Sequence, residues 1–108
     1  MIAETPRPPY YVAIFSSLRT GGDNGYSDMA DRMFELAKQQ EGFLGVESAR
    51  EVIGITVSYW RDAESIKKWK ENAEHTVARE KGRNDWYLSF KVRIAKVERD
   101  YGFNLPKS

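Results

Sequence analysis

Hydrophobic residues recur along this chain with two different periods, and the change of period predicts the order of its secondary-structure elements. In the run from Gly54 to Trp60, isoleucine, valine and tyrosine alternate with threonine, serine and tryptophan, which is the period of a strand. A later run has its apolar residues at helical spacing, at Ile66, Trp69, Ala73 and Val77. The whole chain then reads strand, helix, strand, strand, helix, strand, at residues 10–18, 27–40, 43–52, 55–60, 63–81 and 86–97.

This order predicts an α+β fold of the ferredoxin-like type, a βαββαβ antiparallel sheet with both helices on one face. The first strand, residues 10–18, is apolar at positions that point to both faces of the sheet. We therefore expect both faces to be covered, one by the helices and the other by a partner subunit or a second sheet. The expected assembly is a homodimer.

Particular residues are expected to cap or end the helices and to interrupt the strands. Gly42 is expected to end the first helix in a left-handed conformation, and Gly82 the second. Asp62 is expected to cap the second helix at its N-terminus. A bulge is expected at Gly45, and either a bulge or the end of the strand at residues 95–97, where the alternation slips.

Composition excludes several classes of function. The 108 residues fit one domain, and a net charge of +1 favours neither nucleic acid nor an anionic membrane as a partner. There is no cysteine, which excludes thiolate chemistry and fits a cytoplasmic location. One histidine without a ligand-spaced cluster predicts no metal site. No apolar run reaches the roughly 18 residues of a membrane span.

Large aromatic residues gather around the second predicted helix, together with the only histidine. His75 is either a proton shuttle beside a substrate or a half-exposed helix residue, since it lies about 120° around the helix from Trp69. Trp69 is either a core residue or the wall of a pocket. Trp60 either caps one end of the sheet or borders that pocket.

Other polar and aromatic side chains complete the candidate set. Arg79 is a candidate to hold a carboxylate or phenolate, the alternative being a salt bridge. Tyr59 and Tyr87 are candidates to hydrogen-bond a ligand, and the alternative is that they only fix the packing. Phe90 is a further candidate for the wall of the pocket. We thus expect catalytic roles for His75, Arg79 and Trp69. The residues expected to contact the substrate are Trp60, Tyr59, Tyr87 and Phe90.

Several ordered segments are similar to the antibiotic biosynthesis monooxygenase domain family. The resemblance covers residues 10–103, between a flexible leader at residues 1–9 and a tail at residues 104–108. It is carried by the segments 42–45 and 55–60, by the pattern Ile66, Trp69, His75 and Ala78, and by Tyr87 with Phe90. It implies a homodimer in which two sheets face each other as an α+β barrel.

The resemblance leaves more than one activity open. Some members of the family resemble cofactor-free oxygenases of polycyclic phenols, whereas related proteins bind and cleave haem. In the haem-cleaving relatives a histidine follows the tryptophan at Trp69 by ten residues, where this chain has Arg79, and an asparagine on the first strand is replaced by Ser16 or Ser17. These departures make haem a minor alternative.

The sequence therefore predicts an oxygenase-like enzyme that needs no cofactor and acts on an aromatic or quinone-like small molecule in an apolar pocket. One alternative is a non-catalytic dimeric protein that binds an apolar ligand or haem. Another is a structural module in which every aromatic residue belongs to the core.

Overall fold

The computed structural model describes residues 1–80 and 86–106, including the side chains of all of these except residues 77–80. No helix within this part of the chain is long and apolar enough to cross a membrane. The elements follow in the order β1 (Tyr10–Arg19), α1 (Tyr26–Lys38), β2 (Phe43–Arg50), β3 (Gly54–Trp60), α2 (Ala63–Glu80) and β4 (Tyr87–Val97).

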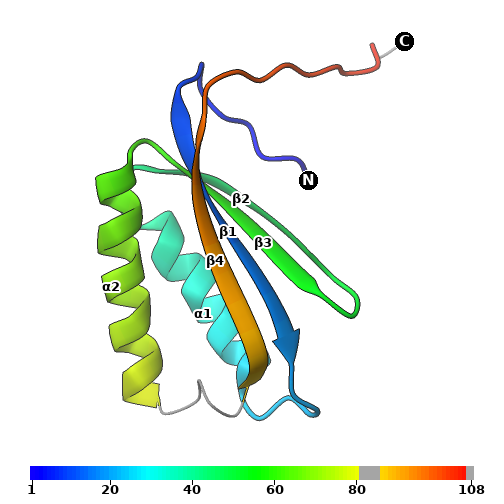
Figure 1. Ribbon diagram of the computed structural model, residues 1–108, viewed down its shortest axis with the longest axis vertical. Coiled ribbons are helices and arrows are strands. Elements are labelled where there is room, and N and C mark those ends of the chain that lie inside the picture. The colour runs from blue at the N-terminus through cyan, green and yellow to red at the C-terminus, as the bar shows by residue number, and fades with distance from the viewer. Residues whose placement is uncertain (81–85, 107–108) are drawn as a thin grey trace.

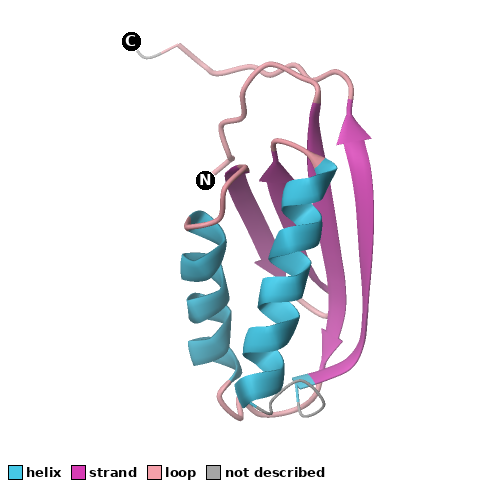
Figure 2. Ribbon diagram, turned by 90° about the vertical axis from the view of Figure 1, so that its left-hand side faces the viewer, coloured by secondary structure: helices cyan, strands magenta, loops and turns pink. Residues whose placement is uncertain are grey.

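The four strands form one antiparallel sheet in the order β2-β3-β1-β4, and both helices lie on the same face of it (Figure 1). Figure 2 looks onto the helices, with the sheet behind them. This arrangement confirms the predicted ferredoxin-like fold. It also places β1 in the interior of the sheet, where it pairs with β3 on one side and with β4 on the other.

Most of the residues expected to cap, turn or interrupt the elements do so in the structure. Gly42 has the expected left-handed conformation, with a φ of 86°, but it does not end α1, which stops at Lys38 with Gln39 as its C-cap. The pairing of β2 with β3 shifts between Phe43 and Gly45, which is the expected bulge. Asp62 caps α2, because its Oδ1 accepts a hydrogen bond from the backbone N–H of Ser65 at 2.8 Å. The expected terminator of α2, Gly82, lies outside the described residues.

The slip in alternation at residues 95–97 marks the end of a strand. It predicted either a bulge or a strand end, and β4 ends at Val97. There is no bulge at this end, because β1 and β4 pair without interruption as far as Tyr10 and Val97. The register shifts at the other end of the pair, between Leu18 and Arg19.

The core between sheet and helices is centred on Trp60, which is fully buried. Its ring stacks on that of Trp69 of α2 at 6.0 Å between centroids and meets Phe43 edge-on at 5.4 Å. Its Nε1 donates a hydrogen bond to Ser58 Oγ at 2.8 Å, so the buried indole has its polar partner. We call this group, with Ala13 and Ile66, the tryptophan core.

The opposite face of the sheet is contacted at one end by the N-terminal segment. Glu47 of β2 accepts hydrogen bonds from the backbone N–H of Ala3 at 2.9 Å and from the Tyr59 hydroxyl at 2.5 Å. These bonds hold the pKa of Glu47 below its usual value. Burial, and then the bond to Glu47, raise the pKa of Tyr59 to about 12.

We expect Trp60→Ala to lower the free energy of unfolding by about 3–5 kcal/mol, because it leaves a cavity between Trp69 and Phe43. Urea unfolding at fixed protein concentration measures the change. Val52→Ala is the control, since Val52 is 81% exposed at the β2–β3 turn and should cost little. A loss below about 1 kcal/mol for Trp60→Ala would contradict the assigned core.

The raised pKa of Tyr59 predicts a loss of stability in alkali. The folded protein favours the neutral hydroxyl, so its contribution is complete below the ordinary pKa of 10.0 and is lost as the pH rises towards about 12. The stability difference between wild type and Tyr59→Phe should therefore shrink over this interval, as measured by urea midpoints. Tyr101→Phe, at a 95% exposed position, is the control. A pH-independent difference would refute the assignment.

Candidate functional site

The helix-facing side of the sheet carries a strip of small and polar residues. Ala13 belongs to the tryptophan core and therefore faces the helices, and the strand partners of alternate β1 residues face the same way. On β3 these partners are Trp60 at one end and then Ser58, Thr56 and Gly54, whereas Ile55, Val57 and Tyr59 point to the other side. Small side chains here leave room beneath the helices that large apolar residues would have filled.

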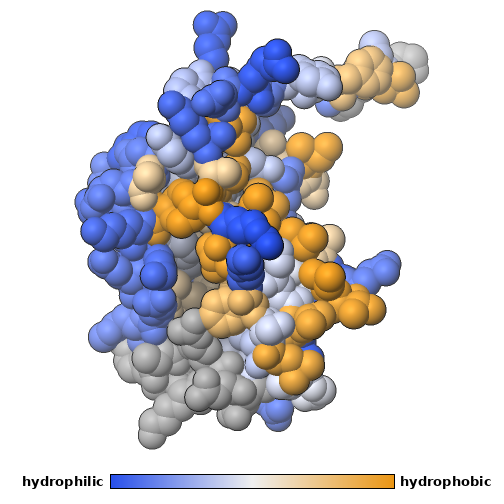
Figure 3. Space-filling view, in the orientation of Figure 1, coloured by the Kyte–Doolittle hydropathy of each residue, from blue (hydrophilic) through white to orange (hydrophobic). Residues whose placement is uncertain are grey.

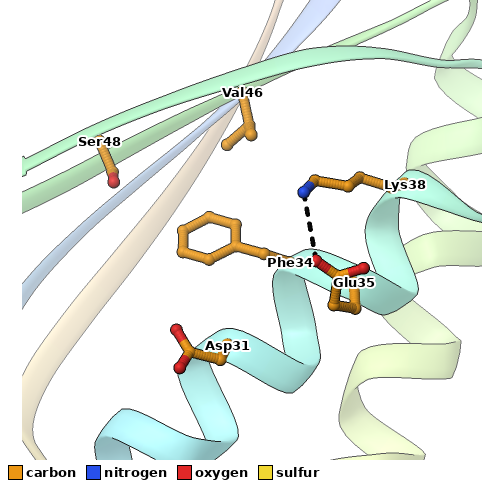
Figure 4. Close-up of a pocket in the computed structure, with 6 residues that line it drawn as sticks. All are labelled: Asp31, Phe34, Glu35, Lys38, Val46 and Ser48. Carbon is orange, nitrogen blue, oxygen red and sulfur yellow. Dashed lines mark hydrogen bonds and ion pairs between the residues drawn. The ribbon is translucent and has the colours of Figure 1, made fainter. Parts of the chain in front are cut away.

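A hollow of about 480 Å³ lies beside this strip, between α1 and β2. This volume is within the range of pockets that hold small molecules. Phe34 points from α1 towards the sheet, and Val46 and Ser48 point from β2 towards α1 (Figure 4). The full lining is Asp31, Phe34, Glu35, Lys38, Val46 and Ser48.

The walls of the hollow have different characters. Lys38 and Glu35 form an ion pair at 3.2 Å on the exposed edge. Ser48 lies on the helix-facing side of β2 directly opposite Thr56, which is in turn opposite Phe15. Because adjacent strands are about 4.8 Å apart, the hollow reaches within about 10 Å of Phe15. An aromatic ligand in this space would meet apolar rings and hydroxyl groups together.

The end of the strip farthest from the tryptophan core carries a second set of rings, which we call the aromatic cluster. Phe15 stacks on Phe90 at 5.3 Å between centroids, and Tyr87 meets Phe15 edge-on at 5.5 Å. Tyr26 contacts Tyr87 at 5.8 Å and Trp86 at 6.1 Å. Burial, and then a hydrogen bond to Tyr26, raise the pKa of Tyr87, so its hydroxyl stays protonated at neutral pH.

The structure divides the expected substrate-contact residues among three places. Trp60 lies in the tryptophan core, where it is closed off from solvent. Tyr59 lies on the opposite face of the sheet, bonded to Glu47. Tyr87 and Phe90 lie together in the aromatic cluster, 5.7 Å apart. Of these four expected substrate-contact residues, only Tyr87 and Phe90 lie together.

The three residues expected to be catalytic all belong to α2. Trp69 is half-buried against the tryptophan core. His75 is exposed. Arg79 lies within the helix, but its side chain lies outside the described residues. The catalytic roles of these residues remain predictions.

The hollow and the aromatic cluster contain residues that the sequence analysis did not select, above all Phe15, Tyr26, Phe34 and Ser48. One signal was present: the polar half of β3, with Thr56 and Ser58, forms a face of its own in the alternation. That pattern does not tell which face meets the helices. The aromatic cluster also joins residues far apart in the chain, which periodicity does not connect.

The sequence is similar to members of one protein family. The model of the antibiotic biosynthesis monooxygenase family matches residues 9–81. The uncharacterized protein YqjZ of Bacillus subtilis (strain 168) is 53% identical over 100 residues, which cover 91% of this chain and 88% of YqjZ.

Two further relatives are more distant. Jasmonate monooxygenase ABM of Pyricularia oryzae is 35% identical over 43 residues, covering 40% of this chain and 20% of that protein. The crystal structure of SnoaB, a cofactor-independent oxygenase from Streptomyces nogalater, superposes with a TM-score of 0.63 at 10% identity, covering 93% of this chain and all (100%) of SnoaB. At this identity the likeness to SnoaB shows the shared fold. From the family match and the identity with YqjZ together, the chain belongs to the antibiotic biosynthesis monooxygenase family.

Proposed function

We propose that this protein is a cofactor-independent monooxygenase that acts on an aromatic or quinone-like small molecule held between its helices and its sheet. The observation that carries the proposal is the strip of small polar residues between two groups of aromatic rings, with a hollow of about 480 Å³ beside it. Membership of the family supports it, as do the oxygenase activities named for SnoaB and for the fungal relative.

The proposed chemistry draws its electrons from the substrate. A phenolate or enolate next to a reactive CH2 group reacts with O2: one oxygen atom becomes a carbonyl on the carbon that loses two hydrogens, and the other leaves as water. Apolar rings such as Phe15 and Phe34 exclude bulk water and strengthen polar contacts to the anion. Tyr87, whose hydroxyl is hydrogen-bonded to Tyr26, contributes a protonated phenol to the same site.

Residues of α2 complete the proposed site. Trp69 stacks on Trp60 at one end of the strip, and His75 and Arg79 follow on the same helix. We propose that His75 or Arg79 stabilises the phenolate, as a cation or a hydrogen-bond donor. Arg79 occupies the position of the histidine in haem-cleaving relatives, so a reaction without haem is the proposed one, in the cytoplasm.

We also propose that the protein acts as a homodimer. On the sheet face away from the helices, Ile55 is 45% exposed, and Ile14 and Val57 lie on the same face, half-buried. Figure 3 shows hydrophobic residues gathered along the right-hand side of the molecule, which is this side of the sheet. A second copy related by two-fold symmetry would cover this face with the same residues.

We expect the purified protein to catalyse uptake of one O2 per anthrone, a polycyclic probe with a reactive CH2 group, to give anthraquinone and water. Ser48→Leu should fill the hollow and lower kcat/KM by about tenfold or more. Lys68→Leu, on the exposed side of α2, is the matched control, and added haemin should not change the rate. An oxygen electrode measures the uptake of O2, and absorbance measures the formation of anthraquinone.

Two outcomes would contradict this proposal. Oxygen uptake no faster than without protein would argue against the oxygenase activity on this class of substrate. If turnover is unchanged in Trp69→Phe, His75→Ala and Arg79→Ala alike, the assignment of catalytic residues to α2 is wrong.

Light scattering at micromolar concentration should give the mass of two chains. Ile55→Arg should give the mass of one chain, because it places a charge in the covered face. Ala63→Arg, exposed on the helix side, should remain dimeric. A monomeric wild-type protein would refute the proposed assembly.

A further inference from the structure

The side chain of Arg50 crosses the helix-facing side of the sheet. Arg50 ends β2, yet its Nη2 donates to Ser17 Oγ of β1 at 2.5 Å and its Nη1 lies 3.4 Å from the carbonyl oxygen of Ser17. Between these strands lies Gly54 of β3, paired with both residues. A Cβ on Gly54 would collide with the guanidinium of Arg50, so the glycine makes the crossing possible.

A second guanidinium lies at the next helix-facing position of β1. Arg19 follows Ser17 by two residues, which is about 6.8 Å along a strand. Its Cζ lies 3.5 Å above the ring centroid of Tyr26, and its Nη2 donates to the carbonyl oxygen of Gly22 at 3.1 Å. Its Nε is buried and has no hydrogen-bond acceptor among the described residues. A buried donor without an acceptor is costly.

The charges of both guanidinium groups affect the same residue, Tyr87. Both lower the pKa of Tyr87 through their charge, against the larger effects of burial and of Tyr26. In the part of the chain that the structure describes, no carboxylate forms an ion pair with either arginine. Hydrogen bonds from Ser27 and Gly25, and then the charge of Arg19, lower the pKa of Asp23, so this acid lies near Arg19 without forming an ion pair with it. Among the described residues, neither guanidinium is therefore paired with a carboxylate.

We propose that Arg19 and Arg50 bind the carboxylate of an anionic small molecule whose apolar part lies against Phe15 and Phe90. A guanidinium offers two parallel N–H donors that match the two oxygens of a carboxylate. The stacked rings of Phe15 and Phe90 lie beside Ser17, which Arg50 contacts, because Phe90 is the strand partner of Ser17. This inference rests on the proposed function and specifies its substrate as a carboxylic acid.

The direct test is calorimetric titration with 2-naphthoate and with its neutral isostere 2-naphthamide, under conditions without turnover. We expect saturable binding of the acid and at least about tenfold weaker binding of the amide, the size expected for a charge-assisted contact. Arg50→Gln should weaken binding of the acid by about tenfold or more and leave the affinity for the amide unchanged. Arg7→Gln, which removes an exposed arginine of the N-terminal segment, is the matched control.

A second variant guards against a folding defect in the first. Gly54→Ala keeps both arginines but displaces the guanidinium of Arg50, and it should also reduce the preference for the acid. Equal affinity for acid and amide, no binding of either, or wild-type affinity for the acid in both variants would each overturn the proposal. Because binding is measured without oxygen, an inactive oxygenase that still prefers the acid would refute the proposed reaction and leave the carboxylate site standing.

Discussion

A single sheet has two faces, and the two helices of this chain cover only one of them. Neighbouring residues of β1 point to opposite faces, and yet Val12 and Ala13 are both buried. The more apolar half of β3, which includes Ile55, points away from the helices. On β3 the helix side therefore holds polar side chains between Trp60 and Gly54, and the opposite side is the one where we propose a partner.

Packing on the helix side is concentrated at its two ends. The stack of Trp60 on Trp69 holds α2 to the sheet at one end, and the rings around Tyr87 gather at the other. Between them Thr56 and Ser58 contribute little bulk. Burial of large aromatic residues at both ends stabilises the fold.

Local signals predicted the elements well, whereas the site depends on contacts between distant residues. Asp62 and Gly42 act within a few residues of themselves, so their roles in α2 and after α1 could be read from the sequence. Arg50 contacts Ser17, 33 residues away in the sequence, and only the strand register shows that Gly54 lies between them. Alternation in β3 separated two faces, but it did not tell which one the helices cover.

The most direct test of this division of the sheet is a crystal structure of the protein grown with 2-naphthoate. We expect the carboxylate between Arg19 and Arg50 on the helix side, and two copies joined through the face that carries Ile55. A ligand bound on the Ile55 face, or copies joined through the helices, would contradict it.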